Sequence, residues 1–198
     1  GQPGAQDEEA PEQTEHERKF DFHLPRLTAI VLFFLSYPGM HQLGKTKLMK
    51  LLYYADFDHM ERYDEPITGA IYRKLPQGPV PDEADAALDI LAADGRLRMD
   101  RVALGRYERF TYAVLAPPDR SALNDAQWET VEAVARHWRF YGLNELVEAT
   151  HSEAPWLGVE ELDPIPYELA YYRNTFGEMN LDPDEVAAMD DDDQSITS

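Results

Sequence analysis

Residues 39–46, GMHQLGKT, match the pattern G-x-x-x-x-G-K-[ST] that marks phosphate-binding loops. In such a loop the backbone N–H groups surround the phosphates, the lysine reaches their outer oxygens, and the serine or threonine hydroxyl holds magnesium. The pattern therefore raises the hypothesis that Gly44, Lys45 and Thr46 bind a nucleotide.

The surrounding sequence supplies few of the elements that a phosphate loop needs. A buried parallel strand must lead into the loop, but Pro25 and the apolar residues after it fit a helix over 25–37 equally well. A second strand must end in an aspartate for the metal, and the best candidate places two prolines before its aspartate. We therefore interpret the match as accidental, with Thr46 capping a helix and with Lys45 and Lys47 in solvent.

Acidic and histidine side chains gather in DFDHME, residues 56–61. Asp56 and His59 are one helical turn apart, but no third ligand is evident, so we predict no metal site. Asp56 lies between two apolar residues on a mostly apolar helix. Because a buried carboxylate needs hydrogen-bond donors, we expect it to be partly buried and bonded to Tyr72 or to a backbone N–H.

His151 and Glu153 precede Trp156 in THSEAPW, residues 150–156, and could act as an acid and a base. We favour a structural role, in which both side chains pin the turn after a helix and Trp156 packs in the core. No set of serine, histidine and aspartate stands out. The chain has no cysteine, which excludes thiol nucleophiles, thiolate metal sites and disulfides. The sequence thus predicts neither catalysis nor a cofactor.

The chain is strongly acidic, since 38 Asp and Glu against 18 Lys and Arg give a net charge of −20 over 198 residues. Residues 1–19 and 178–198 contribute −4 and −8, and their composition predicts two disordered acidic tails. The remaining acidic body makes nucleic acid an improbable partner. No apolar stretch approaches the ~20 residues that span a bilayer, and no signal peptide is visible, so we expect a cytoplasmic protein without a membrane partner.

The pattern between the tails predicts one α+β domain over 20–177, predominantly helical, with a small antiparallel β-sheet or hairpin. Apolar periodicity and turn residues place its elements. Helices are expected over 25–37, 46–63, 82–94, 124–140, 144–150 and 167–175, a strand over 67–75, a tight turn over 77–81, and a hairpin of strands 96–101 and 107–115.

Five arginines cluster on the expected hairpin, namely Arg96, Arg98, Arg101, Arg106 and Arg109. They could form a wing that touches nucleic acid or an acidic partner surface. Alternatively, the hairpin face is solvated and pairs with the acidic helices. Both interpretations stay open at this point.

Three segments resemble, in the same order along the chain, the Panacea or SocA-like antitoxin domain. They are KLMKLLYYADFDHMERY (47–63), PITGAIYRKLPQGPVP (66–81) and THSEAPW (150–156). The matching motif residues are Lys47, Leu48, Lys50, Leu51, Leu52, Tyr53, Ala55, Asp56, Gly69, Tyr72, Gly78, Pro79, Val80, Thr150, His151, Glu153, Pro155 and Trp156. The resemblance spans about 25–175 and places GMHQLGKT in a helix–helix connection.

The resemblance implies a protein without enzymatic activity, an antitoxin that binds and neutralises a cognate protein toxin encoded beside it. The SocA member also works as an adaptor that hands its toxin to the ClpXP protease, which makes a ClpXP-type protease a second expected partner. The sequence shows no appended helix-turn-helix domain, so the resemblance does not extend to autoregulation through DNA.

We expect the toxin to contact parts of 66–81 and of the hairpin. The expected contact residues are Tyr72, Arg73, Gln77, Arg96, Arg98 and Arg106. Two alternatives from other classes remain. One is a winged-helix-like DNA-binding regulator that uses the hairpin arginines, and the other is a nucleotide-binding protein that uses residues 44–46.

Overall fold

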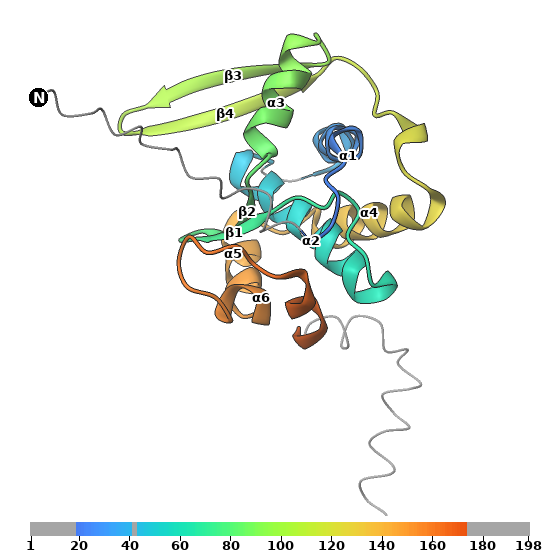
Figure 1. The fold of residues 1–198 in the computed structure, drawn as a ribbon. Helices are drawn as coiled ribbons and strands as arrows, with labels where there is room; N and C mark the ends of the chain where they lie inside the picture. Colours follow the sequence, from blue (N-terminus) through green and yellow to red (C-terminus); the bar gives the residue numbers. More distant parts are fainter. Residues whose placement is uncertain (1–18, 41–42, 174–198) are drawn as a thin grey trace, which may run out of the picture.

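The computed structural model describes residues 19–40 and 43–173. Apart from Lys19, the predicted tails at 1–19 and 178–198 lie outside the described residues, so the division of the chain into a domain and two tails stays a prediction. The described chain confirms a predominantly helical α+β fold with two small antiparallel sheets (Figure 1). None of its described helices is long and apolar enough to cross a membrane.

The elements follow one another in an order close to the predicted one. They are α1 (Leu24–Ser36), α2 (Lys45–Tyr63), β1 (Tyr72–Leu75), β2 (Gly78–Pro81), α3 (Ala84–Ala93), β3 (Leu97–Leu104), β4 (Tyr107–Val114), η1 (Arg120–Ala122), α4 (Asp125–Trp138), α5 (Leu143–His151), α6 (Ala154–Leu157) and η2 (Tyr167–Tyr172).

Helix α2 lies at the centre of the molecule and contacts α1, α4, α5, β2 and η2. Figure 1 shows α3 and the β3–β4 hairpin on one side of it, and α5, α6 and η2 on the other. Its side chains are buried without interruption from Lys47 to Phe57. A helix that is buried on all sides brings its polar side chains into the core as well. These side chains need hydrogen-bond or ionic partners, which other segments of the fold must supply.

Helix α1 supplies the most apolar part of the core. Every residue from Leu27 to Phe34 is buried, and Pro25 lies in the first turn, where its missing N–H costs nothing. Aromatic rings join α1 and α2 to α4: Phe33 lies 5.5 Å from Trp128, and Tyr54 stacks on Trp138 at 4.8 Å.

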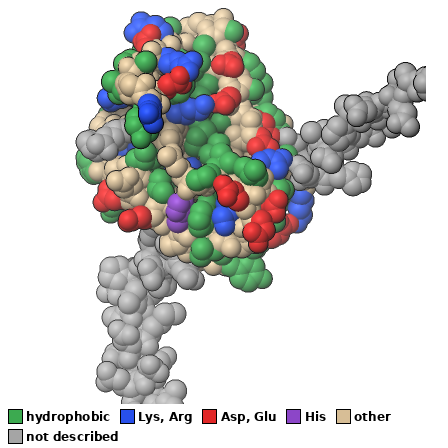
Figure 2. Space-filling view, turned by 90° about the vertical axis from the view of Figure 1, so that its left-hand side faces the viewer, with side chains coloured by type: hydrophobic (Ala, Val, Ile, Leu, Met, Phe, Trp, Pro, Cys, Tyr) green, Lys and Arg blue, Asp and Glu red, His purple; other side chains and the backbone are tan. Residues whose placement is uncertain are grey.

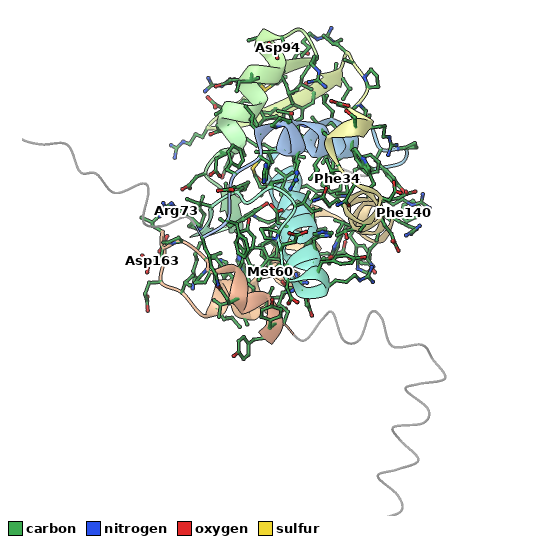
Figure 3. The ribbon with its side chains drawn as sticks, turned by 45° about the vertical axis from the view of Figure 1, so that its right-hand side comes forward. Phe34, Met60, Arg73, Asp94, Phe140 and Asp163 are labelled. Atoms are coloured by element: carbon green, nitrogen blue, oxygen red, sulfur yellow. The ribbon has the colours of Figure 1, made fainter. Side chains whose placement is uncertain are left out.

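Strands β1 and β2 form a small antiparallel sheet in register from Tyr72–Pro81 to Leu75–Gly78. The predicted strand over 67–75 is shorter than expected, and β2 occupies the segment predicted as a turn. The two prolines of β2 are typical of turns because proline has no N–H to donate to a neighbouring strand. In a two-stranded sheet, however, one side of β2 has no strand partner, and proline is tolerated there. On the other side of β1 the chain around Asp163 adds a bridge, and Figure 3 shows Asp163 beside Arg73.

The predicted β3–β4 hairpin is confirmed, with β3 ending three residues later than expected, at Leu104, and with a turn at Gly105, where φ is +65°. Its base packs against α1 and α3, while its distal half projects past the body (Figure 1). Tyr107, near the tip, is 80% exposed.

Several predicted helix ends need correction. Thr46 does not cap α2, because the helix begins one residue earlier and Gly44 is its N-cap. The short helix α6 was not predicted, and the segment predicted as a helix from residue 167 forms the 3-10 helix η2 instead. Asn124, in contrast, caps α4 through a reciprocal pair of bonds with Gln127, the sequence signature of a helix start.

Two glycines with nearly equal φ provide a matched test of close packing. A Cβ at Gly69 (φ +70°) would lie 2.1 Å from the carbonyl oxygen of Asp21, whereas a Cβ at Gly95 (φ +69°) would meet nothing within 4 Å. We expect Gly95→Ala to lower the free energy of unfolding by about 1 kcal/mol through φ alone, and Gly69→Ala by about 3 kcal/mol or more. Urea unfolding followed by circular dichroism measures both, and equal losses would show that the contact at Gly69 is unimportant.

Candidate functional site

Three polar motif residues of α2, Lys50, Tyr53 and Asp56, lie on one face of the helix, because they are spaced by three residues. All three side chains are fully buried. Each is bonded by a different segment that comes later in the chain, so these contacts fix how the β1–β2 sheet, α5, α6 and the last described residues pack around α2.

Lys50 holds the start of β2, directly after the turn between β1 and β2. Its Nζ donates to the carbonyl oxygen of Pro79 at 2.8 Å, and burial lowers the pKa of Lys50 to about 7. Gly78 has φ +106°, and a Cβ there would lie 2.7 Å from both Lys50 Cε and Thr150 Oγ1. Only glycine lets the turn come this close to α2 and α5.

Asp56 organises the chain that leads into β1. It accepts hydrogen bonds from the backbone N–H of Thr68 at 2.7 Å, from the Thr68 hydroxyl, and from the Tyr72 hydroxyl at 2.7 Å. Both of the donors that the sequence offered as alternatives, Tyr72 and a backbone N–H, are therefore bonded to Asp56, which is fully buried and not partly buried as expected. Burial raises the pKa of Asp56, and the hydrogen bonds from Thr68 and Tyr72 oppose that rise by stabilising the carboxylate.

Tyr53 leads to a buried ionic cluster. Its hydroxyl donates to Glu153 Oε2 at 2.6 Å, and Arg173 Nη1 lies 3.7 Å from the same oxygen. Arg173 Nη2 also lies 2.5 Å from Asp58 and 2.7 Å from Glu61. Glu153 was expected to pin the turn after α5, but its side chain reaches α2 instead and makes no capping bond to α6. Sequence reasoning missed Arg173, which follows η2.

His151 and Trp156 form a second contact that ties α5 and α6 to β1. Their rings stack at 4.0 Å, Lys74 Nζ lies 4.0 Å above the Trp156 ring, and Trp156 Nε1 donates to the carbonyl oxygen of Leu75. Trp156 is half-buried at this junction and does not lie in the core as predicted. Burial lowers the pKa of His151, and the nearby positive charges of Lys50 and Lys74 add to the effect, which favours the neutral ring.

The structure does not bring His151 and Glu153 together as an acid–base pair, since Glu153 turns to Tyr53 and His151 turns to Trp156. His59 likewise points away from Asp56 and lies 2.9 Å from the Thr130 hydroxyl. Burial lowers the pKa of His59 to about 4. Within 19–40 and 43–173, no group of three or more His, Asp or Glu side chains is placed to hold a metal ion.

The segment GMHQLGKT connects two helices, as the resemblance implied, and residues 41–42 lie outside the described residues. Helix α1 takes the place of the strand that a phosphate loop requires, and both described sheets are antiparallel. Lys45 pairs with Asp85 at 2.6 Å. Lys47 is not in solvent as predicted, because it is 1% exposed and donates to the carbonyl oxygen of Tyr141 at 2.7 Å.

A surface hollow of about 490 Å³ opens beside these buried contacts, between the first turn of α2, the β1–β2 turn and the start of α3. Met49, Leu75 and Val80 contribute to an apolar lining, and Thr46 and Gln77 lie at its edge with their side-chain oxygens 3.4 Å apart. The hollow is therefore shaped by the same turn that Lys50 holds in place.

The predicted contact residues do not form one patch. Tyr72 is 1% exposed and cannot meet a partner, which corrects that expectation. Arg73 pairs with Asp82, Gln77 lines the hollow, and Arg106 lies at the hairpin tip.

The hairpin arginines also differ from expectation. Arg98 pairs with Asp100, and Arg101 pairs with Glu108, so these bases meet the acids of the hairpin itself and not those of the helices. Arg96, at the base of the hairpin, is half-buried. The reason is local: Arg98 and Asp100 lie two residues apart on the same face of β3, and Arg101 and Glu108 lie diagonally across the two strands.

The lowered pKa of Lys50 predicts a pH-dependent stability. An unfolded lysine titrates near 10.5, so between about pH 7 and 10.5 the unfolded chain binds more protons than the folded one, and stability rises with pH. Relative to Lys50→Met, the wild-type free energy of unfolding should increase by about 2 kcal/mol between pH 7 and 9. Urea unfolding at both pH values measures this, and a difference that does not change with pH would mean that Lys50 stays charged.

Removing Arg173 should leave three acidic side chains without the cation that lies against them. We expect Arg173→Met to lower the free energy of unfolding by about 3–5 kcal/mol. Arg136, exposed on α4, serves as the matched control, and Arg136→Met should change stability by less than about 0.5 kcal/mol. Equal effects of the two substitutions on thermal unfolding would contradict a structural role for the cluster.

The comparisons with known proteins agree with the motif positions. A family model described as "Antitoxin SocA-like, Panacea domain" matches residues 48–157, more than half of the chain. No curated protein and no solved structure matches the chain significantly. The match includes Lys50, Tyr53 and Asp56 and ends after Trp156, before the segment that carries Arg173. The chain therefore belongs to the family of SocA-like antitoxin domains, also called Panacea domains.

Proposed function

We propose that this protein is the antitoxin of a toxin–antitoxin pair and neutralises a cognate protein toxin by direct binding in the cytoplasm. The family match over 48–157 carries the proposal. The matched motif residues also support a binding role, because Lys50, Tyr53 and Asp56 are enclosed and bonded to neighbouring segments. Such residues stabilise a surface, and a partner is then recognised by what lies on that surface.

A binding role without chemistry also fits the placement of the titratable residues. Glu153 is 2% exposed and His59 is 2% exposed, so neither can reach a substrate. Catalytic acids and bases must come within hydrogen-bond distance of the group that reacts. The described surface instead offers a hollow beside the β1–β2 turn and a projecting hairpin, which suit contact with another protein.

Growth rescue tests the proposal. The neighbouring gene is expressed alone and together with this protein, each from a promoter unrelated to the native one, so that repression of transcription cannot explain a rescue. We expect the neighbour to halt growth alone, and this protein to restore growth and to co-purify with it. A neighbour that is harmless, or that never binds, would contradict the proposal.

The amount of toxin in the rescued cells separates direct block from the adaptor role. Direct binding predicts that growth returns while the toxin stays abundant and bound. A toxin that disappears in the presence of this protein, and reappears in cells without ClpXP, would show that delivery to the protease and not steric block ends its activity.

A further inference from the structure

Three neighbouring hollows surround the first turn of α2, with volumes of about 490, 270 and 460 Å³. The first and second share Lys45 and Thr46 in their linings, and the second and third share Gly44, Arg109 and Phe110. Because adjacent hollows share lining residues, they make up one region of the surface, which we call the α2 trough. It passes over residues 44–46, the segment whose match to the phosphate loop the fold does not use.

Four separate parts of the fold make the walls of the α2 trough: the β1–β2 turn, the start of α3, strand β4 and the start of α5. One wall is fixed from below, since Lys50 holds the β1–β2 turn through Pro79. At the middle, Lys45 Nζ lies 5.3 Å from the Phe110 ring, so α2 and the hairpin meet there. The lining is largely apolar, with Met49, Leu75, Val80, Phe110 and Leu143 among its members.

The charge around the α2 trough differs between its walls. On the α3 side Asp85 pairs with Lys45, whereas the hairpin, residues 97–114, carries four bases against two acids, Asp100 and Glu108. The whole chain has 18 bases against 38 acids. Figure 2, the side from which the hairpin tip projects, shows hydrophobic side chains across the middle and Lys and Arg side chains mainly in the upper part.

Helix α2 adds to this positive potential. Its N-cap is Gly44, which has no side chain to accept a bond from the first N–H groups, and its first turn holds no acidic residue. The positive end of the helix dipole therefore faces the α2 trough without an acidic side chain of the same turn to offset it.

The exposed half of the hairpin points to a partner as well. Val102, Leu104 and Tyr107 are 45%, 54% and 80% exposed. A two-stranded hairpin is only marginally stable in water, and large apolar side chains on its free end are better explained by a partner that covers them.

We propose that the α2 trough is the docking site for the toxin, and that the toxin inserts an extended acidic segment with large apolar side chains. This inference rests on the proposed function and names the surface that performs it. Carboxylates would meet Arg109 and the first N–H groups of α2 and would replace Asp85 as the partner of Lys45, while apolar side chains would fill the hollows. Nucleic acid fits less well, because the lining is largely apolar and its few charged residues include the acids Asp85 and Glu108.

The test uses the full chain and the toxin identified by growth rescue. Lys45→Glu and Arg109→Glu are combined, because both side chains reach the surface of the α2 trough and neither lies in the core. Arg136→Glu, on the exposed face of α4, is the control with the same kind of charge change. Circular dichroism and thermal unfolding establish that all variants are folded.

We expect the double variant to bind the toxin at least about tenfold more weakly by calorimetry and to lose growth rescue, while Arg136→Glu behaves like the wild type. The affinity of the wild type should fall with added NaCl, and that of the double variant should fall less. Replacing an acidic residue of the toxin segment by Arg should restore binding to the double variant, which a merely misfolded variant would not show.

Other outcomes overturn the inference in distinguishable ways. A wild type that binds no neighbour removes the proposed function and the docking site together. A double variant that binds and rescues like the wild type leaves the antitoxin proposal standing and removes the α2 trough as its site. Binding of Mg-ATP or single-stranded RNA that the double variant loses would assign the trough to phosphates.

The same variants also test the occupants that this chain itself could supply. A synthetic peptide of residues 174–198 that competes with the toxin only on the wild type would make the chain's own C-terminal segment the occupant. Light scattering that shows a wild-type dimer and a monomeric double variant would make a second copy the occupant.

Discussion

The fold depends on one constraint: the polar side chains of a fully enclosed central helix must each find a partner. Lys50, Tyr53 and Asp56 enter the core on one face of α2, and an unpaired charge or hydroxyl there would cost several kcal/mol. Each is bonded by a segment distant in sequence. Satisfying these groups therefore determines where the β1–β2 sheet, α6 and Arg173 lie, and with them the shape of the surface.

This division of roles explains why several residues that resemble catalytic residues in the sequence are enclosed in the structure. Tyr53 and Glu153 are close enough for proton transfer, but they are enclosed together with Arg173 and stabilise the packing of three segments. The side chains that a partner can contact lie at the surface, around the first turn of α2 and along the β3–β4 hairpin. Three motif residues, Lys47, Lys50 and Val80, contribute to the lining of the α2 trough. The other motif residues lie outside this lining and stabilise the segments that carry it.

Much of the fold could be predicted from the sequence, because helix periodicity and capping residues are local signals. Helices α1 to α5 and the β3–β4 hairpin follow from such signals. The sequence also predicted that Asp56 would be bonded to Tyr72 or to a backbone N–H, since a carboxylate on an apolar helix requires a donor, and the structure shows both bonds. Strand β2 was not predicted because its prolines are typical of turns, although proline is tolerated in a strand that has no strand partner on one side. Helix α6 was not predicted because it is a single turn.

The candidate site was harder to predict, because long-range packing decides it. Lysines are usually solvated, so Lys47 was predicted to lie in solvent. In the structure it donates a hydrogen bond to a backbone carbonyl oxygen far along the chain. Arg173 contacts Asp58 across 115 positions, and no local pattern could reveal this pair. The α2 trough likewise combines walls from four elements, and only the folded chain shows that the residues of GKT face one side of it.

The central claim is that a buried polar framework presents the α2 trough to the toxin. Hydrogen–deuterium exchange of the full chain, free and bound to its toxin, tests this most directly. We expect binding to slow exchange at residues 43–47 and 107–112, with little change along the exposed face of α4. Protection confined to α4, or spread elsewhere with 43–47 and 107–112 unchanged, would contradict it.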